Sequence, residues 1–204
     1  MFYVVIPTGK NMAGQSSKMK SRLSTIRYEM TRDFIAHHTS KIIPEFTSED
    51  EQKIMEIFEI PDMKTCVVTG EKVAKSGGDH LFEVRGYLKK TGKVGIEQKW
   101  NRLPVSTSEN IRYKKFKFTD DNDKSYTKNI GWEELTDAEF NLCTPKQQRL
   151  YRNIRKWFSY CEEKNVMLGV EMPDVARMEM EKAIDSAMEI LLEGIERMKK
   201  SSSN

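Results

Sequence analysis

The feature that most constrains the fold is a change in hydrophobic pattern between Thr65 and about Tyr113. Helical spacing of apolar residues gives way to short alternating segments, such as CVVTG, HLFEVRGYL and VGIEQKW, which are separated by glycine and proline turns. The segment STSENIRYKKF then predicts a helix that begins at a serine or threonine cap. This order of elements predicts a small ββα unit in the middle of the chain, with an extended hairpin around YLKKTGKVG between its strands.

The N-terminal flank has a helical pattern instead. Apolar residues recur at helical spacing over about 21–38, and Ser48 followed by Glu51 forms a capping box that predicts the start of a second helix. The opening FYVVIP predicts a short strand. The polar stretch from Thr8 to about Lys20 predicts a loop or a basic arm.

The C-terminal third also predicts helices. A second capping box lies at Thr136 and Glu139, and Thr144 with Pro145 marks another helix start. In the helix that follows, we expect Trp157 to lie in the core rather than on a nucleic-acid surface. A last helix is expected after Pro173.

Together these patterns predict an α+β fold. Residues 1–64 are expected to hold the strand, the basic arm and the helices, and residues 65–118 the ββα unit. Residues 119–200 are expected to be helical, and residues 201–204 a disordered tail.

Charge is segregated along the chain although the formal net charge is only +3. Basic stretches such as IRYKKFK alternate with acidic ones such as TSEDEQKIMEIFE, which favours one face turned towards a polyanion. The apolar runs are too short to span a membrane, and the opening lacks the basic region of a signal peptide. We therefore expect an intracellular, cytoplasmic protein with no membrane partner.

The candidate chemistry lies within the ββα unit. Asp79–His80 precedes Asn101 by about twenty residues, Pro104 lies three residues after Asn101, and Asn110 falls in the predicted helix. This ordered set resembles the HNH family of nucleases, whose ββα-metal fold carries these residue types on its first strand, its loop and its helix. The resemblance covers roughly residues 66–115, and it implies a ββα-metal catalytic unit embedded between helical segments.

The resemblance also implies a role for each residue. His80 would be the general base, Asp79 and Asn110 would bind Mg²⁺ or Mn²⁺, and Asn101 would orient the histidine through a hydrogen bond to the loop backbone. A neutral imidazole can take a proton from water near pH 7, and hard oxygen ligands suit these cations. Adjacent strand residues point to opposite sides, so a twist or a bulge, which Gly77–Gly78 would permit, is needed for both side chains to face one site.

The chain departs from the family at the cysteines that hold a structural zinc in many HNH proteins. Cys66 occupies the first of these positions, but Thr69, Ser106 and Glu109 occupy the other three. One thiolate cannot complete a tetrahedral site. We therefore expect no structural zinc, with apolar packing holding the unit together, through Val67, Val68, Leu103, Val105 and Ile111.

The expected partner is double-stranded DNA. A unit this small needs further contacts to hold DNA, and basic residues around it are candidates for binding phosphates. They are Lys89, Lys90, Lys93, Arg112, Lys114, Lys115 and Lys117. A restriction-type enzyme that cuts a palindrome would be a homodimer. A mobile-element or homing nuclease, a structure-specific nuclease, and a non-catalytic nucleic-acid-binding protein remain alternatives.

Overall fold

The computed structural model describes residues 17–39, 43–73, 78–84, 92–110 and 112–201. The predicted α+β character is confirmed at this level, with long helices and three separate two-stranded sheets among these residues. In chain order the elements are α1 (Ser17–Thr39), α2 (Ser48–Phe58), β1 (Gly78–His80), β2 (Lys93–Gly95), η1 (Lys99–Asn101), β3 (Arg102–Pro104), β4 (Lys115–Thr119), β5 (Ser125–Asn129), α4 (Asp137–Leu142), α5 (Pro145–Glu163), β6 (Gly169–Glu171) and α6 (Asp174–Ser201).

The body of the molecule surrounds an aromatic core. Trp100 from η1 and Trp157 from α5 are both almost fully buried, and their rings stack with centroids 5.9 Å apart. The indole nitrogen of Trp157 donates a hydrogen bond of 3.0 Å to the Trp100 carbonyl. The predicted core position of Trp157 is therefore confirmed, and α5 supports the segment that carries Asn101.

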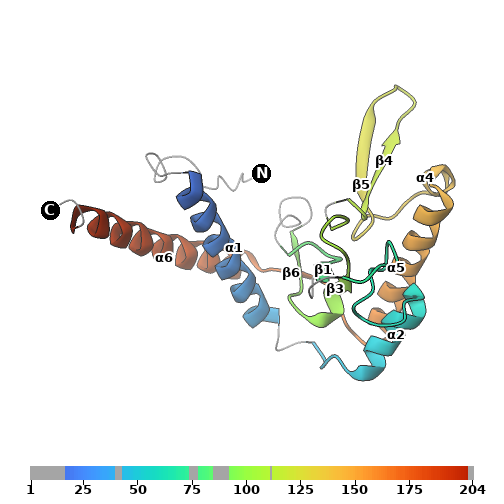
Figure 1. The fold of residues 1–204 in the computed structure, drawn as a ribbon, viewed down its shortest axis with the longest axis horizontal. Coiled ribbons are helices and arrows are strands. Elements are labelled where there is room, and N and C mark those ends of the chain that lie inside the picture. Colours follow the sequence, from blue (N-terminus) through green and yellow to red (C-terminus); the bar gives the residue numbers. More distant parts are fainter. Residues whose placement is uncertain (1–16, 40–42, 74–77, 85–91, 111, 202–204) are drawn as a thin grey trace.

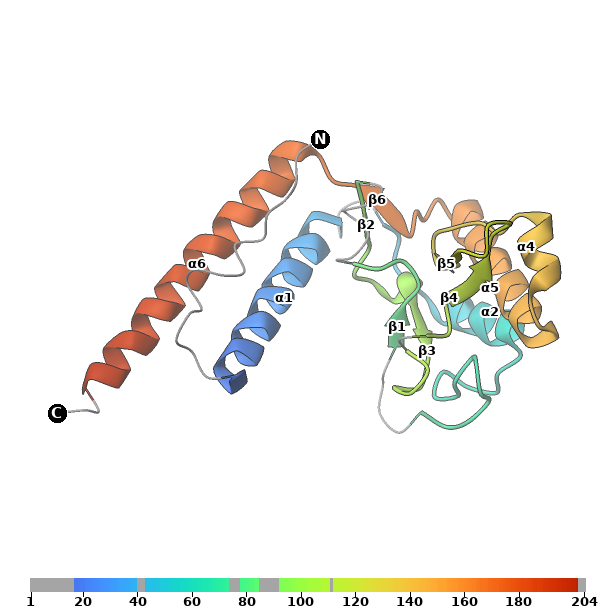
Figure 2. The same cartoon turned by 90° about the horizontal axis from the view of Figure 1, so that it is seen from above.

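A helical arm extends from this body. Helices α1 and α6 lie side by side and run in opposite directions, as both ribbon views show (Figures 1 and 2). They share a second core that includes Leu23, Ile35 and Ile184, and Arg27 pairs with Asp185 at 2.7 Å. The same core contains Val84, which follows β1, and Val94 of β2, so the arm packs against this part of the body.

The strand pairing differs from the predicted hairpin. In the described residues β1 pairs antiparallel with β3, while β2 pairs antiparallel with β6 near the C-terminus. Residues 85–91, where the hairpin turn was expected, lie outside the described residues. Gly169 of β6 makes the second pairing possible, because a Cβ there would lie 2.0 Å from the Phe82 ring. The C-terminal region thus completes the unit that the sequence predicted to be continuous.

Two helix starts are confirmed and one is shifted. Thr136 and Thr144 cap α4 and α5 through capping boxes, as expected. The start of α2 lies one residue earlier than predicted, because Thr47 is the cap and Asp50 completes the box. Asp50 was the better partner because its carboxylate also accepts a hydrogen bond of 2.8 Å from the Tyr160 hydroxyl.

Three other predicted elements change. CVVTG is a turn that ends at Gly70, whose φ of +73° suits glycine, rather than a strand. The described residues around Asn110 form successive turns instead of a regular helix, and Lys115 already begins β4. Helix α6 includes Ser201, while residues 1–16, with the predicted first strand, and residues 202–204 lie outside the described part. No helix in the described ranges is long and apolar enough to cross a bilayer.

Candidate active site

Asp79 lies in the middle of β1, opposite Leu103 of β3. Its carboxylate Oδ2 is 2.7 Å from the Lys114 ammonium, which also donates to the backbone carbonyl of His80. The side chains of Asp79 and Lys114 are only 14% and 4% exposed. Lys114 was expected to bind phosphates at the surface, and the structure instead places it inside the site as the partner of Asp79.

Asn110 reaches the same carboxylate from the turns after β3. Its amide has two possible orientations. With its nitrogen towards Asp79, the Asn110 amide donates hydrogen bonds to the carboxylate oxygens Oδ1, at 2.5 Å, and Oδ2, at 3.3 Å. With its oxygen towards Asp79, two acceptors face each other at the same distances. The orientation with the nitrogen towards Asp79 is the one that satisfies both side chains. The structure thus brings together Asp79 and Asn110, the two predicted metal ligands.

Tyr113 adds a buried hydroxyl to this side of the site. Burial first, and then the negative charge of Asp79, raise the pKa of its phenol well above the ordinary value. The hydroxyl therefore stays protonated at neutral pH, and it has no hydrogen-bond partner among the described residues. Sequence reasoning missed Tyr113, because a tyrosine within the predicted helix of STSENIRYKKF resembles a core residue.

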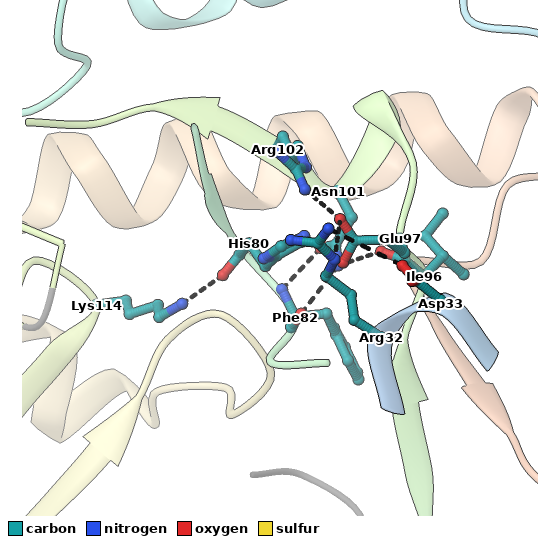
Figure 3. A network of polar contacts seen from close by, with 9 residues as sticks. All are labelled: Arg32, Asp33, His80, Phe82, Ile96, Glu97, Asn101, Arg102 and Lys114. Carbon is teal, nitrogen blue, oxygen red and sulfur yellow. Dashed lines mark hydrogen bonds and ion pairs between the residues drawn. The ribbon is translucent and has the colours of Figure 1, made fainter. Parts of the chain in front are cut away.

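His80 faces a different group of side chains. Its Nε2 is 3.0 Å from Oε2 of Glu97, and the two side chains are 14% and 9% exposed. This is an ion-pair distance rather than an aligned hydrogen bond, and neither atom has a hydrogen-bond partner among the described residues. In Figure 3, Glu97 and two arginines lie on one side of His80, and Lys114 approaches its carbonyl from the other.

Asn101 is the best-anchored side chain of the site. It is fully buried, and its Oδ1 accepts a hydrogen bond of 2.8 Å from the Phe82 backbone nitrogen. Its Nδ2 donates to the carbonyls of Phe82 and Ile96, both at 2.9 Å (Figure 3). The resemblance implied such a hydrogen bond between Asn101 and the loop backbone. One of the partners, Phe82, lies two residues after His80.

Asp79 and His80 keep the alternation of a regular strand. β1 and β3 pair one to one from Gly78 to His80, with no extra residue on either strand. The described strand therefore has no bulge that would turn both side chains to one side, and Gly77 lies outside the described residues. Asp79 faces Lys114 and Asn110, whereas the imidazole faces Glu97.

The residues present fit a hard divalent cation. Asp79 and Asn110 offer one carboxylate and one amide oxygen, and Mg²⁺ in proteins is often held by one or two carboxylates, with water filling its other positions. Among the described residues, no three His, Cys, Asp or Glu side chains gather as a metal cluster. A cation here would therefore depend on Asp79, Asn110 and water, next to the ammonium of Lys114.

Cys66 lies at the position of a zinc ligand in the resembling family. It is fully buried, and its sulfur accepts a hydrogen bond of 3.3 Å from the backbone nitrogen of Ser106. Burial alone would raise the pKa of this thiol, but backbone and hydroxyl donors of Ser106, Thr69 and Val68 outweigh it and lower the pKa. Leu103 and Val105 are buried beside it, and Val67 and Val68 pack against the same core.

The predicted DNA contacts are spread over several environments. Lys115 and Lys117 are exposed on one face of the β4–β5 ribbon, which projects from the body in Figure 1, and Arg112 is exposed just before it. Lys93 is half-buried in β2. Lys89 and Lys90 lie outside the described residues.

The comparisons with known proteins add no relative. No protein-family model, curated protein or solved structure matches this chain.

Proposed function

We propose that this protein is a metal-dependent endonuclease that hydrolyses phosphodiester bonds of double-stranded DNA, in the manner of HNH enzymes. The observation that carries the proposal is the meeting of Asp79 and Asn110. The Asn110 amide donates to the Asp79 carboxylate over 2.5 Å when its nitrogen faces Asp79, although the two residues lie on segments separated by thirty residues in the sequence. Asp79 directly precedes His80 on β1. Asn101 also supports the proposal, because its side chain anchors the backbone at Phe82, just after His80.

In this proposal each residue of the site has a separate task. Asp79 and Asn110 would hold Mg²⁺ or Mn²⁺, which would stabilise negative charge on the phosphate and the leaving oxygen. His80 would accept a proton from the attacking water. Lys114 would hold Asp79 in place before substrate binds, and the Tyr113 hydroxyl would donate a hydrogen bond to neighbouring oxygens.

DNA would be gripped outside the site. Arg112, Lys115 and Lys117 lie immediately after Asn110, so a phosphate held at Asp79 would place neighbouring phosphates within reach of the β4–β5 ribbon. Such contacts position DNA without reading its bases. A restriction-type role with a homodimer is the form we favour, and mobile-element or structure-specific cleavage are the variants.

A non-catalytic nucleic-acid-binding protein is the second candidate. The ion pair between Lys114 and Asp79 favours it, because the ammonium already neutralises the carboxylate that would bind the metal. The orientation of His80 towards Glu97 is compatible with it as well.

Incubation of the protein with supercoiled plasmid and MgCl₂, with and without chelator, separates the two candidates. Discrete fragments that disappear with chelator would support site-specific cleavage, and nicked circles would support a single-strand cutter. Unchanged plasmid at protein concentrations that shift DNA in a gel would support the binding-only protein.

A further inference from the structure

Glu97 is a buried acid beside the proposed base, in a segment that carries no family motif. It lies between β2 and η1, and its side chain is 9% exposed. Its Oε2 is 3.0 Å from Nε2 of His80 (Figure 3). A buried carboxylate needs charged or hydrogen-bonding partners, so the partners of Glu97 indicate its role in the site.

Two arginines hold the other oxygen of Glu97. Arg102 of β3 donates to Oε1, and Nε of Arg32 from α1 lies 3.8 Å from the same atom. Burial would raise the pKa of Glu97, but His80 and Arg102 outweigh burial and lower it. Glu97 is therefore ionised at neutral pH, with one oxygen directed to the imidazole and the other to the arginines.

Asn101 fixes the distance between His80 and Glu97. Its side chain bonds at once to Phe82, two residues after the histidine, and to Ile96, the residue before the glutamate. The two segments approach closely at Gly95, where a Cβ would lie 2.1 Å from the Phe82 carbonyl oxygen. The pair is thus set by buried backbone contacts and not by flexible surface side chains.

We infer that Glu97 is the positioning residue of His80 in the proposed reaction. Its carboxylate favours the tautomer with the proton on Nε2, which leaves the lone pair on Nδ1 to accept the proton of water. The proton on Nε2 stays there, and the adjacent carboxylate stabilises the imidazolium that forms. Because Arg32 belongs to α1, the helical arm supports this pair as well. The inference rests on the proposed function.

The test compares Glu97→Gln and Glu97→Asp with Glu139→Gln. Glu139 is a matched control, because its side chain is 8% exposed and pairs with Lys128 at 2.6 Å, between β5 and α4. Glu97→Gln should lower the single-turnover cleavage rate by about 10²-fold, within the range of general base catalysis, and leave DNA affinity unchanged. Glu97→Asp should restore part of the rate, and Glu139→Gln should keep the full rate.

A double variant separates positioning from general stability. In a His80→Ala protein, Glu97→Gln should cause no further loss of rate, because the glutamate acts through the missing imidazole. An equal loss in both backgrounds, or an unchanged rate for Glu97→Gln in the otherwise wild-type protein, would overturn the inference.

A second measurement, by NMR, does not depend on DNA cleavage. The chain has three histidines, so their imidazole Cε1–H signals can be assigned by NMR through single replacements. Glu97→Gln should move the His80 signal and leave those of His37 and His38, and Glu139→Gln should move none of them. An unmoved His80 signal would overturn the inference. If the wild-type protein cuts no DNA, the proposed function fails, and this signal still decides whether Glu97 holds the imidazole.

Discussion

Lys114 lies deeper in the molecule than a lysine that grips phosphates. Its side chain is 4% exposed, and the ammonium contacts both the Asp79 carboxylate and the His80 carbonyl. The sequence showed only a basic run, IRYKKFK, in which neighbouring lysines look equivalent. The structure separates them, because Lys115 and Lys117 lie on the exposed face of β4, whereas Lys114 lies in the turn before it and points inward.

Replacing Lys114 tests the charge balance of the site. Lys114→Met should lower the free energy of unfolding by about 3 kcal/mol, because the buried carboxylate of Asp79 loses its partner. If Asp79 and Asn110 bind a divalent cation, MgCl₂ should raise the melting temperature of this variant more than that of the wild-type protein.

The control for this experiment is Lys128→Met, which breaks the pair with Glu139. It should lose stability without any rescue by MgCl₂. An equal response of both variants to the salt would show that Asp79 has no site for the cation.

The contacts of some site residues could be predicted from the sequence, and those of others could not. A hydrogen bond from Asn101 to the loop backbone could be expected from the family resemblance, whereas its partners Phe82 and Ile96 could not. Glu97 could not, since it meets His80 only after β1 and β2 have been brought together by Asn101. Long-range pairing of this kind leaves no local periodic signal.

At the scale of elements, helices were predicted better than strands. Capping boxes depend on residues three positions apart, so Thr136 and Thr144 were recognised directly. The partners of short strands are set elsewhere in the chain, and β2 pairs with β6 more than seventy residues later. The predicted helix at Asn110 failed because Tyr113 and Lys114 turn inward towards Asp79 just before β4 begins.

Glu139 links the β4–β5 ribbon to α4 and predicts acid sensitivity. Burial would raise its pKa, but Lys128, Thr136 and Tyr126 lower it from 4.5 to about 2. Because the pKa is lowered in the folded state, the ionised Glu139 contributes to the free energy of unfolding above pH 4.5, and this contribution is lost as the pH falls towards 2. The loss amounts to at most about 3 kcal/mol in unfolding free energy.

Urea unfolding of the wild-type protein and of Glu139→Gln over that pH range measures this contribution. The variant should be less stable at pH 7 and should lose less stability on acidification. Glu196→Gln, on an exposed part of α6, is the control and should follow the wild-type protein. Parallel curves for Glu139→Gln and the wild-type protein would assign the acid sensitivity to other groups.

The turn that carries Cys66 is expected to fold without zinc. Its sulfur already accepts backbone hydrogen bonds, and Val67 donates a hydrogen bond of 2.9 Å to the Pro104 carbonyl across the turn. Elemental analysis of protein purified without chelator should find zinc well below one atom per chain. Chelator should leave the melting temperature unchanged, and stoichiometric zinc lost together with stability would refute this expectation.

At the scale of the whole molecule, the body and the arm meet at the proposed site. Arg32 reaches Glu97 from α1 (Figure 3), while the β4–β5 ribbon begins at Lys115, soon after Asn110, and projects from the body (Figure 1). DNA bound at Asp79 would therefore contact the β4–β5 ribbon, and the arm would support the site through the contact of Arg32 with Glu97.

The salt dependence of DNA binding tests this arrangement. Replacing Arg112, Lys115 or Lys117 by alanine should lower the magnitude of the slope of log K against log salt by about 0.9 each on duplex DNA. Sequence preference should stay the same, because these residues contact the backbone. Lys182→Ala, on the exposed face of α6, should leave the slope unchanged. A slope that changes only with Lys182 would move the DNA to the arm.

The central claim is that Asp79 and His80 perform metal-dependent cleavage, and single-turnover cleavage of supercoiled plasmid in MgCl₂ tests it most directly. Asp62→Asn is the matched control, because Asp62 also pairs with a lysine, Lys72, but lies in the exposed loop after α2. We expect this control to cut like the wild-type protein, and Asp79→Asn and His80→Ala to be slower by about 10²–10⁴-fold with DNA affinity retained. Cleavage by His80→Ala at the wild-type rate would contradict the claim.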